Sequence, residues 1–118
     1  MVAQIAEPTR VTGTYMDLLD GGSAHLVLNF GLMRALSRQH KDAYAATMKA
    51  LGGAERPDLE AVWSVLWMSY LCGCEYDHTE PMDEDEFYIQ AGGDYFDAMS
   101  AFRELIDPNH KAPTAGRL

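Results

Sequence analysis

Two cysteines and a histidine lie close together in the stretch Cys72-Gly73-Cys74-Glu75-Tyr76-Asp77-His78. Thiolates and imidazoles are ligand types that zinc prefers, and Asp77 or a distant histidine could complete a set of four. Common structural zinc sites, however, use two cysteine pairs with two to four residues between partners, and this chain has one pair with a single residue between. We therefore interpret Cys72 and Cys74 as small buried apolar residues and predict no metal and no cofactor. A small metal-binding or thiol-dependent protein that uses Cys72, Cys74 and His78 remains an alternative.

Catalytic motifs are absent from the sequence. It contains no G-x-S-x-G, no H-E-x-x-H, no phosphate-binding loop and no G-x-G-x-x-G. Carboxylates are so abundant that their pairing says little about acid–base catalysis. We expect a protein that is not an enzyme.

Negative charge is concentrated in one part of the chain. The stretch from Glu75 to Asp107 holds eleven Asp and Glu residues against one base, Arg103, and the whole chain has a formal net charge of -9. Such a charge repels a phosphate backbone, so nucleic acid is not expected as a partner. A protein that blocks a host factor through an acidic surface is a second alternative.

Large aromatic residues are interspersed with these acids. Phe87, Tyr88, Tyr95 and Phe96 exceed what two short helices need for inward packing, so they are the candidate partner-binding residues, in an apolar patch rimmed by carboxylates. The competing interpretation is that all four pack on the helix that contains Trp63 and Trp67.

The first third of the chain predicts a hairpin followed by helices. Strand formers flank the turn residues Asp20-Gly21-Gly22-Ser23, and Leu26, Leu28 and Phe30 should form one buried strand face. From Leu32 to Leu51 the apolar spacing becomes helical, typical of two short helices that meet near Gln39-His40-Lys41 and end at Gly52-Gly53.

The next segment predicts a central helix. Asp58 is a candidate N-cap, and the apolar stripe that follows is wide enough to be covered on more than one side. Gly73 should weaken the end of this helix. The uncharged run from Ala61 to Cys74 is shorter than the roughly 20 residues that cross a bilayer, so we expect no membrane segment.

Two shorter helices should complete the fold. Asp83 and Glu86 form a capping box, Gly92-Gly93 breaks the helix, and Asp94 can cap the next one, which Pro108 ends. The residues expected on the inner face of this last helix are Phe96, Met99, Phe102, Leu105 and Ile106.

The segments together predict a single α+β domain, an N-terminal β-hairpin packed on four to five helices. Residues 1–11 are an N-terminal extension, 12–107 form the domain (hairpin 12–30, helices 31–107, with an acidic C-terminal third), and 108–118 form a flexible tail. The first residues do not form a signal peptide, so a cytoplasmic protein is expected.

The order of these segments resembles the tail assembly chaperones of long-tailed bacteriophages. The resemblance extends from Thr12 to Lys111 and rests on five segments: Thr12-Gly13-Thr14-Tyr15 with the turn at Asp20-Gly21, His25 to Ser37, Asp58-Leu59-Glu60-Ala61-Val62, Pro81 to Phe87, and the helix ending near Asp107-Pro108. It implies a non-enzymatic α+β protein in the host cytoplasm that binds the tape measure protein and keeps it soluble during tail tube assembly. Further partners that it implies are the major tail tube protein, a frameshifted longer form of the chain, and further copies of the chain in a homo-oligomer.

Overall fold

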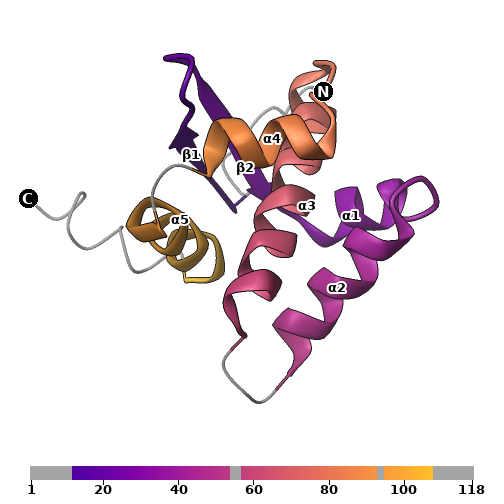
Figure 1. Ribbon diagram of the computed structural model, residues 1–118. Helices are drawn as coiled ribbons and strands as arrows, with labels where there is room; N and C mark the ends of the chain where they lie inside the picture. The colour runs from indigo at the N-terminus through magenta and orange to yellow at the C-terminus, as the bar shows by residue number, and fades with distance from the viewer. Residues whose placement is uncertain (1–11, 54–56, 93–94, 108–118) are drawn as a thin grey trace, which may run out of the picture.

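A computed structural model describes residues 12–53, 57–92 and 95–107. Two strands and five helices follow one another in the order β1 (Thr12–Asp17), β2 (Ser23–Leu28), α1 (Phe30–Leu36), α2 (Lys41–Gly52), α3 (Leu59–Asp77), α4 (Glu84–Ala91) and α5 (Tyr95–Ile106), as Figure 1 shows. The predicted α+β class, a hairpin packed on helices, is confirmed. The predicted N-terminal extension 1–11 and tail 108–118 lie outside the described residues.

The two strands form an antiparallel hairpin whose register runs from Thr12 opposite Leu28 to Asp17 opposite Ser23. The turn lies where it was predicted. Gly21 has a φ of +94°, which a residue without a Cβ adopts at no steric cost, and the Asp20 carboxylate accepts a hydrogen bond from the Gly22 N–H at 2.9 Å.

Strand β2 is buried on both faces, so the prediction of one buried face was wrong. Leu26 lies in the main core, while Val27, on the opposite face, is equally buried in a smaller cluster with Met33, Met68 and Cys72. Helices cover both faces of this strand, and a strand covered on both faces does not alternate between apolar and polar residues. The predicted third residue of the buried face, Phe30, instead begins α1 and is exposed.

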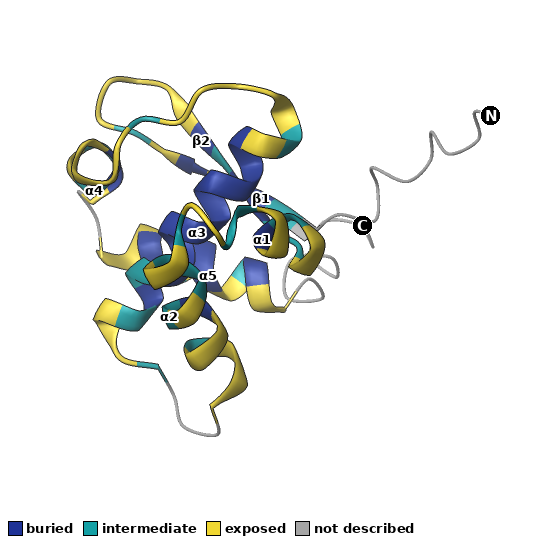
Figure 2. Cartoon of the chain, turned by 90° about the vertical axis from the view of Figure 1, so that its right-hand side faces the viewer, coloured by how far each residue is buried: buried dark blue, intermediate teal, exposed yellow. Residues whose placement is uncertain are grey.

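Helix α3 is the centre of the molecule, and Figure 2 shows it in dark blue among partly exposed neighbours. Its residues from Val65 to Cys74 are all buried, which no single apolar face could produce. The predicted cap is confirmed, since the Asp58 carboxylate accepts a hydrogen bond from the Ala61 N–H at 2.8 Å. The helix continues past Gly73 to Asp77.

Helices α1 and α2 meet at residues 37–40, as predicted. Asn29 caps α1 by accepting a hydrogen bond from the Leu32 N–H at 3.0 Å. In α4, the predicted cap Asp83 accepts a hydrogen bond from the Glu86 N–H at 3.0 Å. The predicted roles of Asp94 and Pro108 lie outside the described residues.

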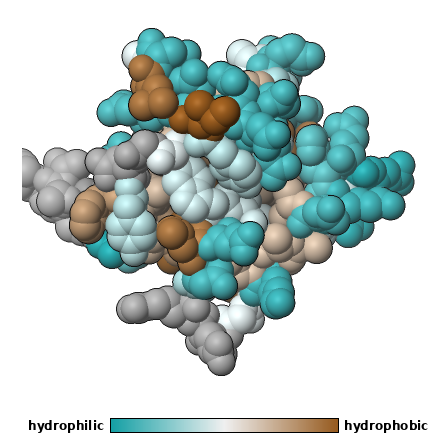
Figure 3. Space-filling view, viewed as in Figure 1, coloured by the Kyte–Doolittle hydropathy of each residue, from teal (hydrophilic) through white to brown (hydrophobic). Residues whose placement is uncertain are grey.

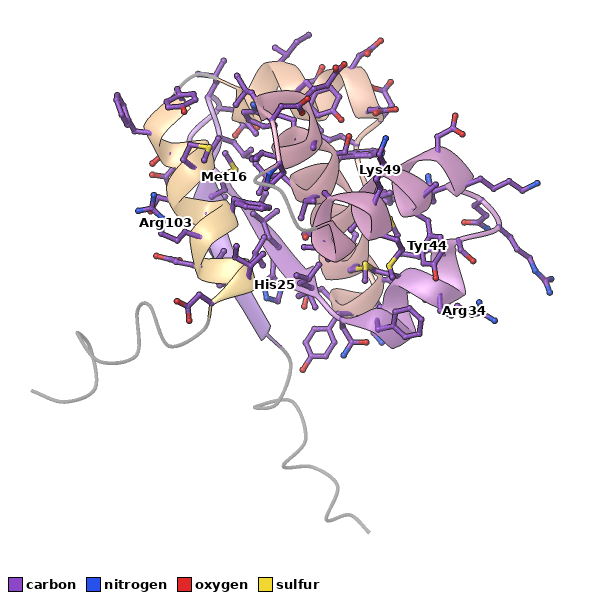
Figure 4. The ribbon with its side chains drawn as sticks, turned by 90° about the horizontal axis from the view of Figure 1, so that it is seen from below. Met16, His25, Arg34, Tyr44, Lys49 and Arg103 are labelled. Atoms are coloured by element: carbon purple, nitrogen blue, oxygen red, sulfur yellow. The ribbon has the colours of Figure 1, made fainter. Side chains whose placement is uncertain are left out.

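Helix α5 packs on the hairpin with a face that includes two of the predicted residues, Phe102 and Leu105, and is completed by alanines. Its buried residues are Ala98, Ala101, Phe102 and Leu105. Phe96 and Ile106 are exposed, so their assignment to the inner face was wrong. Small alanines allow α5 to approach β1 closely, where the Thr14 hydroxyl donates to the Glu104 carboxylate and Met16 lies between strand and helix (Figure 4). Within the described ranges, the helices are too short or too polar to cross a membrane.

Candidate partner-binding site

The structure divides the four candidate aromatic residues between the core and the surface. Phe87 is completely buried, and its ring stacks on Tyr70 with centroids 4.8 Å apart and lies 5.5 Å from Trp67. These contacts anchor α4 to the central helix. Phe87 therefore belongs to the core, as the competing interpretation expected, and its side chain is not available to a partner in this structure.

Tyr88 occupies the boundary between core and surface. Its ring is half-buried and perpendicular to Trp63 at 5.9 Å, and its hydroxyl donates to the Glu84 carboxylate at 3.1 Å. Burial, followed by the negative charge of Glu84, raises the pKa of the Tyr88 phenol above its usual range. The hydroxyl stays protonated at neutral pH and holds the ring at the edge of α4.

Tyr95 and Phe96 are on the surface, in the first turn of α5. Their side chains are 53% and 78% exposed, and the two rings meet edge to face at 5.3 Å. Exposed aromatic rings of this size are common anchors in protein interfaces, because each carries a large apolar area at low conformational cost.

A groove of about 530 Å³ separates these rings from the N-terminal half of α3. Its floor consists of side chains that also belong to the core, Val62 and Phe102. Its walls carry the exposed side chains of Leu59, Tyr95, Phe96 and Ile106, with half-buried Met99 between them.

The exposure of Leu59 and Ile106 was not predicted from the sequence. Both follow the helical apolar spacing, which is typical of the buried side of a helix. Leu59 is the first residue of α3 and Ile106 the last of α5, and both are exposed. Their position at the end of a predicted helix is the sequence feature that could have indicated this exposure.

A second, shallower hollow adjoins the groove and shares Leu59 with it. It is lined by Trp63 and Tyr88, with Glu60 and Glu84 at its margin. The apolar surface therefore extends from α5 across Leu59 to α4, and Figure 3 shows apolar side chains beside strongly hydrophilic ones on this face. We call the groove and this hollow together the α3–α5 surface.

The α3–α5 surface is acidic at its margins. Asp58 and Glu60 flank Leu59 in the sequence, and Glu60 and Glu84 line the hollow, whereas Arg103 is the one charged residue among those that line the groove. The other basic side chains of the described residues, Arg34, Arg38, Lys41 and Lys49, belong to α1, α2 and the link between them; Figure 4 shows Arg34 and Lys49 on the opposite side from Arg103.

The two cysteines point into different parts of the core. Cys72 packs with Val27 and Met68, whereas Cys74 belongs to the main cluster. Burial raises the pKa of the Cys72 thiol to about 12, so it is not a thiolate at neutral pH. Across the described ranges 12–53, 57–92 and 95–107, His, Cys, Asp and Glu side chains nowhere form a group of three suited to a metal ion.

His78, the third residue of the thiol alternative, has a structural position. It is exposed and takes a left-handed φ of 61°, and its backbone N–H donates to the carbonyl oxygens of the last turn of α3. The geometry of the described residues therefore gives no support to a site built from Cys72, Cys74 and His78.

A pair that the sequence did not reveal joins the hairpin to the end of α3. His25 Nδ1 lies 2.7 Å from an Asp77 carboxylate oxygen, and the imidazole stacks on Tyr15 with centroids 4.6 Å apart. The two partners are far apart in the sequence, so no local pattern predicts them. Their arrangement fixes β2 against α3.

Comparison with known proteins finds no match among protein-family models, curated proteins or solved structures.

Proposed function

We propose that this protein is a non-enzymatic phage tail assembly chaperone that binds the tape measure protein and keeps it soluble during tail tube assembly in the host cytoplasm. The observation that carries the proposal is the α3–α5 surface, which presents exposed Tyr95, Phe96, Leu59 and Ile106 on an acidic molecule. The resemblance of the segment order to that chaperone family supplies the identity of the client.

The physical demands of such a role are compatible with this surface. A chaperone for a long, aggregation-prone client needs exposed apolar anchors to hold it and net charge to keep the complex in solution. Its binding must also be weak enough for tube subunits to displace it. A few aromatic side chains on a shallow groove provide moderate affinity, because each ring can bury only its exposed side against the client.

Co-expression with a tape measure protein from the same genome tests the proposal. The wild-type chain should co-purify with the client and raise its soluble fraction, whereas Tyr95→Ala with Phe96→Ala should lose most of the client. The control is Phe30→Ala with Ile89→Ala, which removes two exposed apolar side chains outside the α3–α5 surface. This pair should behave as the wild type.

Circular dichroism of all three proteins establishes that each is folded. A folded Tyr95/Phe96 variant that still holds the client removes Tyr95 and Phe96 from the site. A wild-type chain that neither binds the tape measure protein nor raises its solubility overturns the proposed function. The same co-expression with the major tail tube protein and with a frameshifted longer form tests the other proposed partners.

A further inference from the structure

We infer that the groove between α3 and α5 binds a single amphipathic helix whose apolar stripe is flanked by Lys or Arg. The inference rests on the proposed function and specifies the segment of the client that the groove takes. Three properties of the groove support it: its length, the state of its backbone groups and the charge at its margins.

The length of the groove matches a few turns of helix. Helix α5 has 12 residues and is therefore about 18 Å long, and the groove follows it from Tyr95 to Ile106. Apolar side chains at positions i, i+3 or i+4, and i+7 of a bound helix span about 10 Å along its axis, which is within that length. Such a helix would place its anchors over Val62, Met99 and Phe102 at the floor.

The walls of the groove favour a helix over an extended strand. Both walls are α-helices, whose interior backbone N–H and C=O groups are already hydrogen-bonded within each helix. An extended peptide would find no strand edge there and would leave its own backbone groups unpaired. A helix satisfies its backbone internally and offers only side chains.

The negative charge of the protein favours a basic partner in the groove over a second copy of this chain. Glu60 lines the hollow that shares Leu59 with the groove, and the whole chain has a formal net charge of -9, although Arg103 is the one charged residue that lines the groove itself. A dimer formed by two such grooves facing each other would place acidic margins against acidic margins. A helix with flanking Lys or Arg side chains instead gains favourable pairing at the margins and is guided to the groove from a distance.

Fluorescence anisotropy with labelled synthetic peptides tests the inference on the full chain. One peptide carries Leu at helical spacing with Lys on the flanks, a second has Glu in place of every Lys, and a third is the Lys peptide with a central Pro that breaks the helix. We expect the Lys peptide to bind at least tenfold more tightly than either of the others.

Two variants separate binding in the groove from general attraction to an acidic protein. Phe96→Ala with Ile106→Ala should weaken the Lys peptide tenfold or more, whereas Phe30→Ala with Ile89→Ala should not. Equal binding of the Lys and Glu peptides, or undiminished binding to the folded Phe96/Ile106 variant, overturns the inference. So does a wild-type dimer in analytical ultracentrifugation that the Phe96/Ile106 variant converts to a monomer, because the groove would then be filled by a second copy.

A negative result in the peptide experiment and a negative result in the co-expression experiment have different consequences. Binding of the Lys peptide in the groove without any binding of the tape measure protein supports the groove chemistry and overturns the proposed client. Binding of the tape measure protein without binding of the Lys peptide leaves the proposed function in place and overturns the helical basic segment.

Discussion

The backbone of Gly73 in α3 lies directly against the backbone carbonyl of His25 in β2. A Cβ at position 73 would stand 1.9 Å from that carbonyl oxygen, well inside van der Waals contact. Gly73 and its neighbours Cys72 and Cys74 are all buried, and the strand and the central helix meet here without a side chain between them. The same approach brings the His25 imidazole to Asp77 one turn further along α3.

Replacement of Gly73 by alanine should destabilise the protein strongly. Because the clash is with backbone and not with a flexible side chain, strand and helix must separate, and we expect a loss of about 3 kcal/mol or more. Gly52→Ala is the matched control, since a Cβ there meets nothing within 4 Å in the described part of the chain and alanine favours the helix by up to about 1 kcal/mol. Urea unfolding measures both. A Gly73→Ala protein as stable as the wild type would contradict the close approach.

Ser69 offers a route to a more stable protein. Its hydroxyl is fully buried in α3 and has no hydrogen-bond partner among the residues that the structure describes. Ser69→Ala removes this unsatisfied group, so we expect the free energy of unfolding to rise by about 1 kcal/mol. Ser64→Ala, in the same helix, controls for the better helix propensity of alanine, because the Ser64 hydroxyl donates to the Glu60 carbonyl at 3.2 Å. The gain at position 69 should exceed that at position 64 in thermal or urea unfolding, and a net loss at position 69 would mean that the hydroxyl is satisfied.

The attachment of α5 to the hairpin should depend on the Thr14 hydroxyl. This group is buried and donates to the Glu104 carboxylate, and such charge-assisted bonds contribute about 1.5–3 kcal/mol. Thr14→Val keeps the shape and improves strand propensity, so a loss of stability of about 1–2 kcal/mol would come from the missing donor. Glu104→Gln keeps an acceptor oxygen and should cost less. Equal stability of Thr14→Val and wild type in urea unfolding would exclude this role for the bond.

Stability should fall at alkaline pH partly because of Cys72. Burial raises the pKa of its thiol from 9.0 to about 12, so above pH 9 the unfolded chain releases a proton that the native protein retains. This contribution to stability is complete below pH 9 and decreases between pH 9 and 12, by at most about 1.4 kcal/mol per pH unit.

Comparison of wild type with Cys72→Ala isolates the thiol. Between pH 8 and pH 10 the free energy of unfolding should decrease more in the wild type, by about 1 kcal/mol. The pKa of Tyr70, which burial also raises, affects both proteins equally and cancels. Parallel stability curves for the two proteins would show that Cys72 titrates normally.

Local interactions made much of the fold predictable from the sequence alone. The caps Asp58 and Asp83 bond backbone groups three residues away, and the turn around Gly21 depends on its own backbone conformation. The wide stripe of α3 follows from residue type, since a helix that is apolar all round must be covered on all sides. For these features no knowledge of distant segments is needed.

Tertiary packing decided the features that bear on the candidate site. Phe87 and Phe96 are both aromatic residues in short acidic helices, yet one is completely buried and the other is 78% exposed. The difference arises from how each helix lies on its neighbours. Helix α4 directs Phe87 toward Trp67 and Tyr70, whereas the alanines of α5 form its inner face and leave Phe96 outside.

The sequence by itself thus determined which segments are helices and strands, where α3 and α4 begin, and that the C-terminal third is acidic, because these depend on residues that are neighbours in the chain. The close approach of Gly73 to His25, the burial of both faces of β2 and the groove beside Phe96 were decided only by the tertiary structure. Each depends on contacts between segments far apart in the sequence, and a helical or strand period specifies an apolar face without specifying what will cover it.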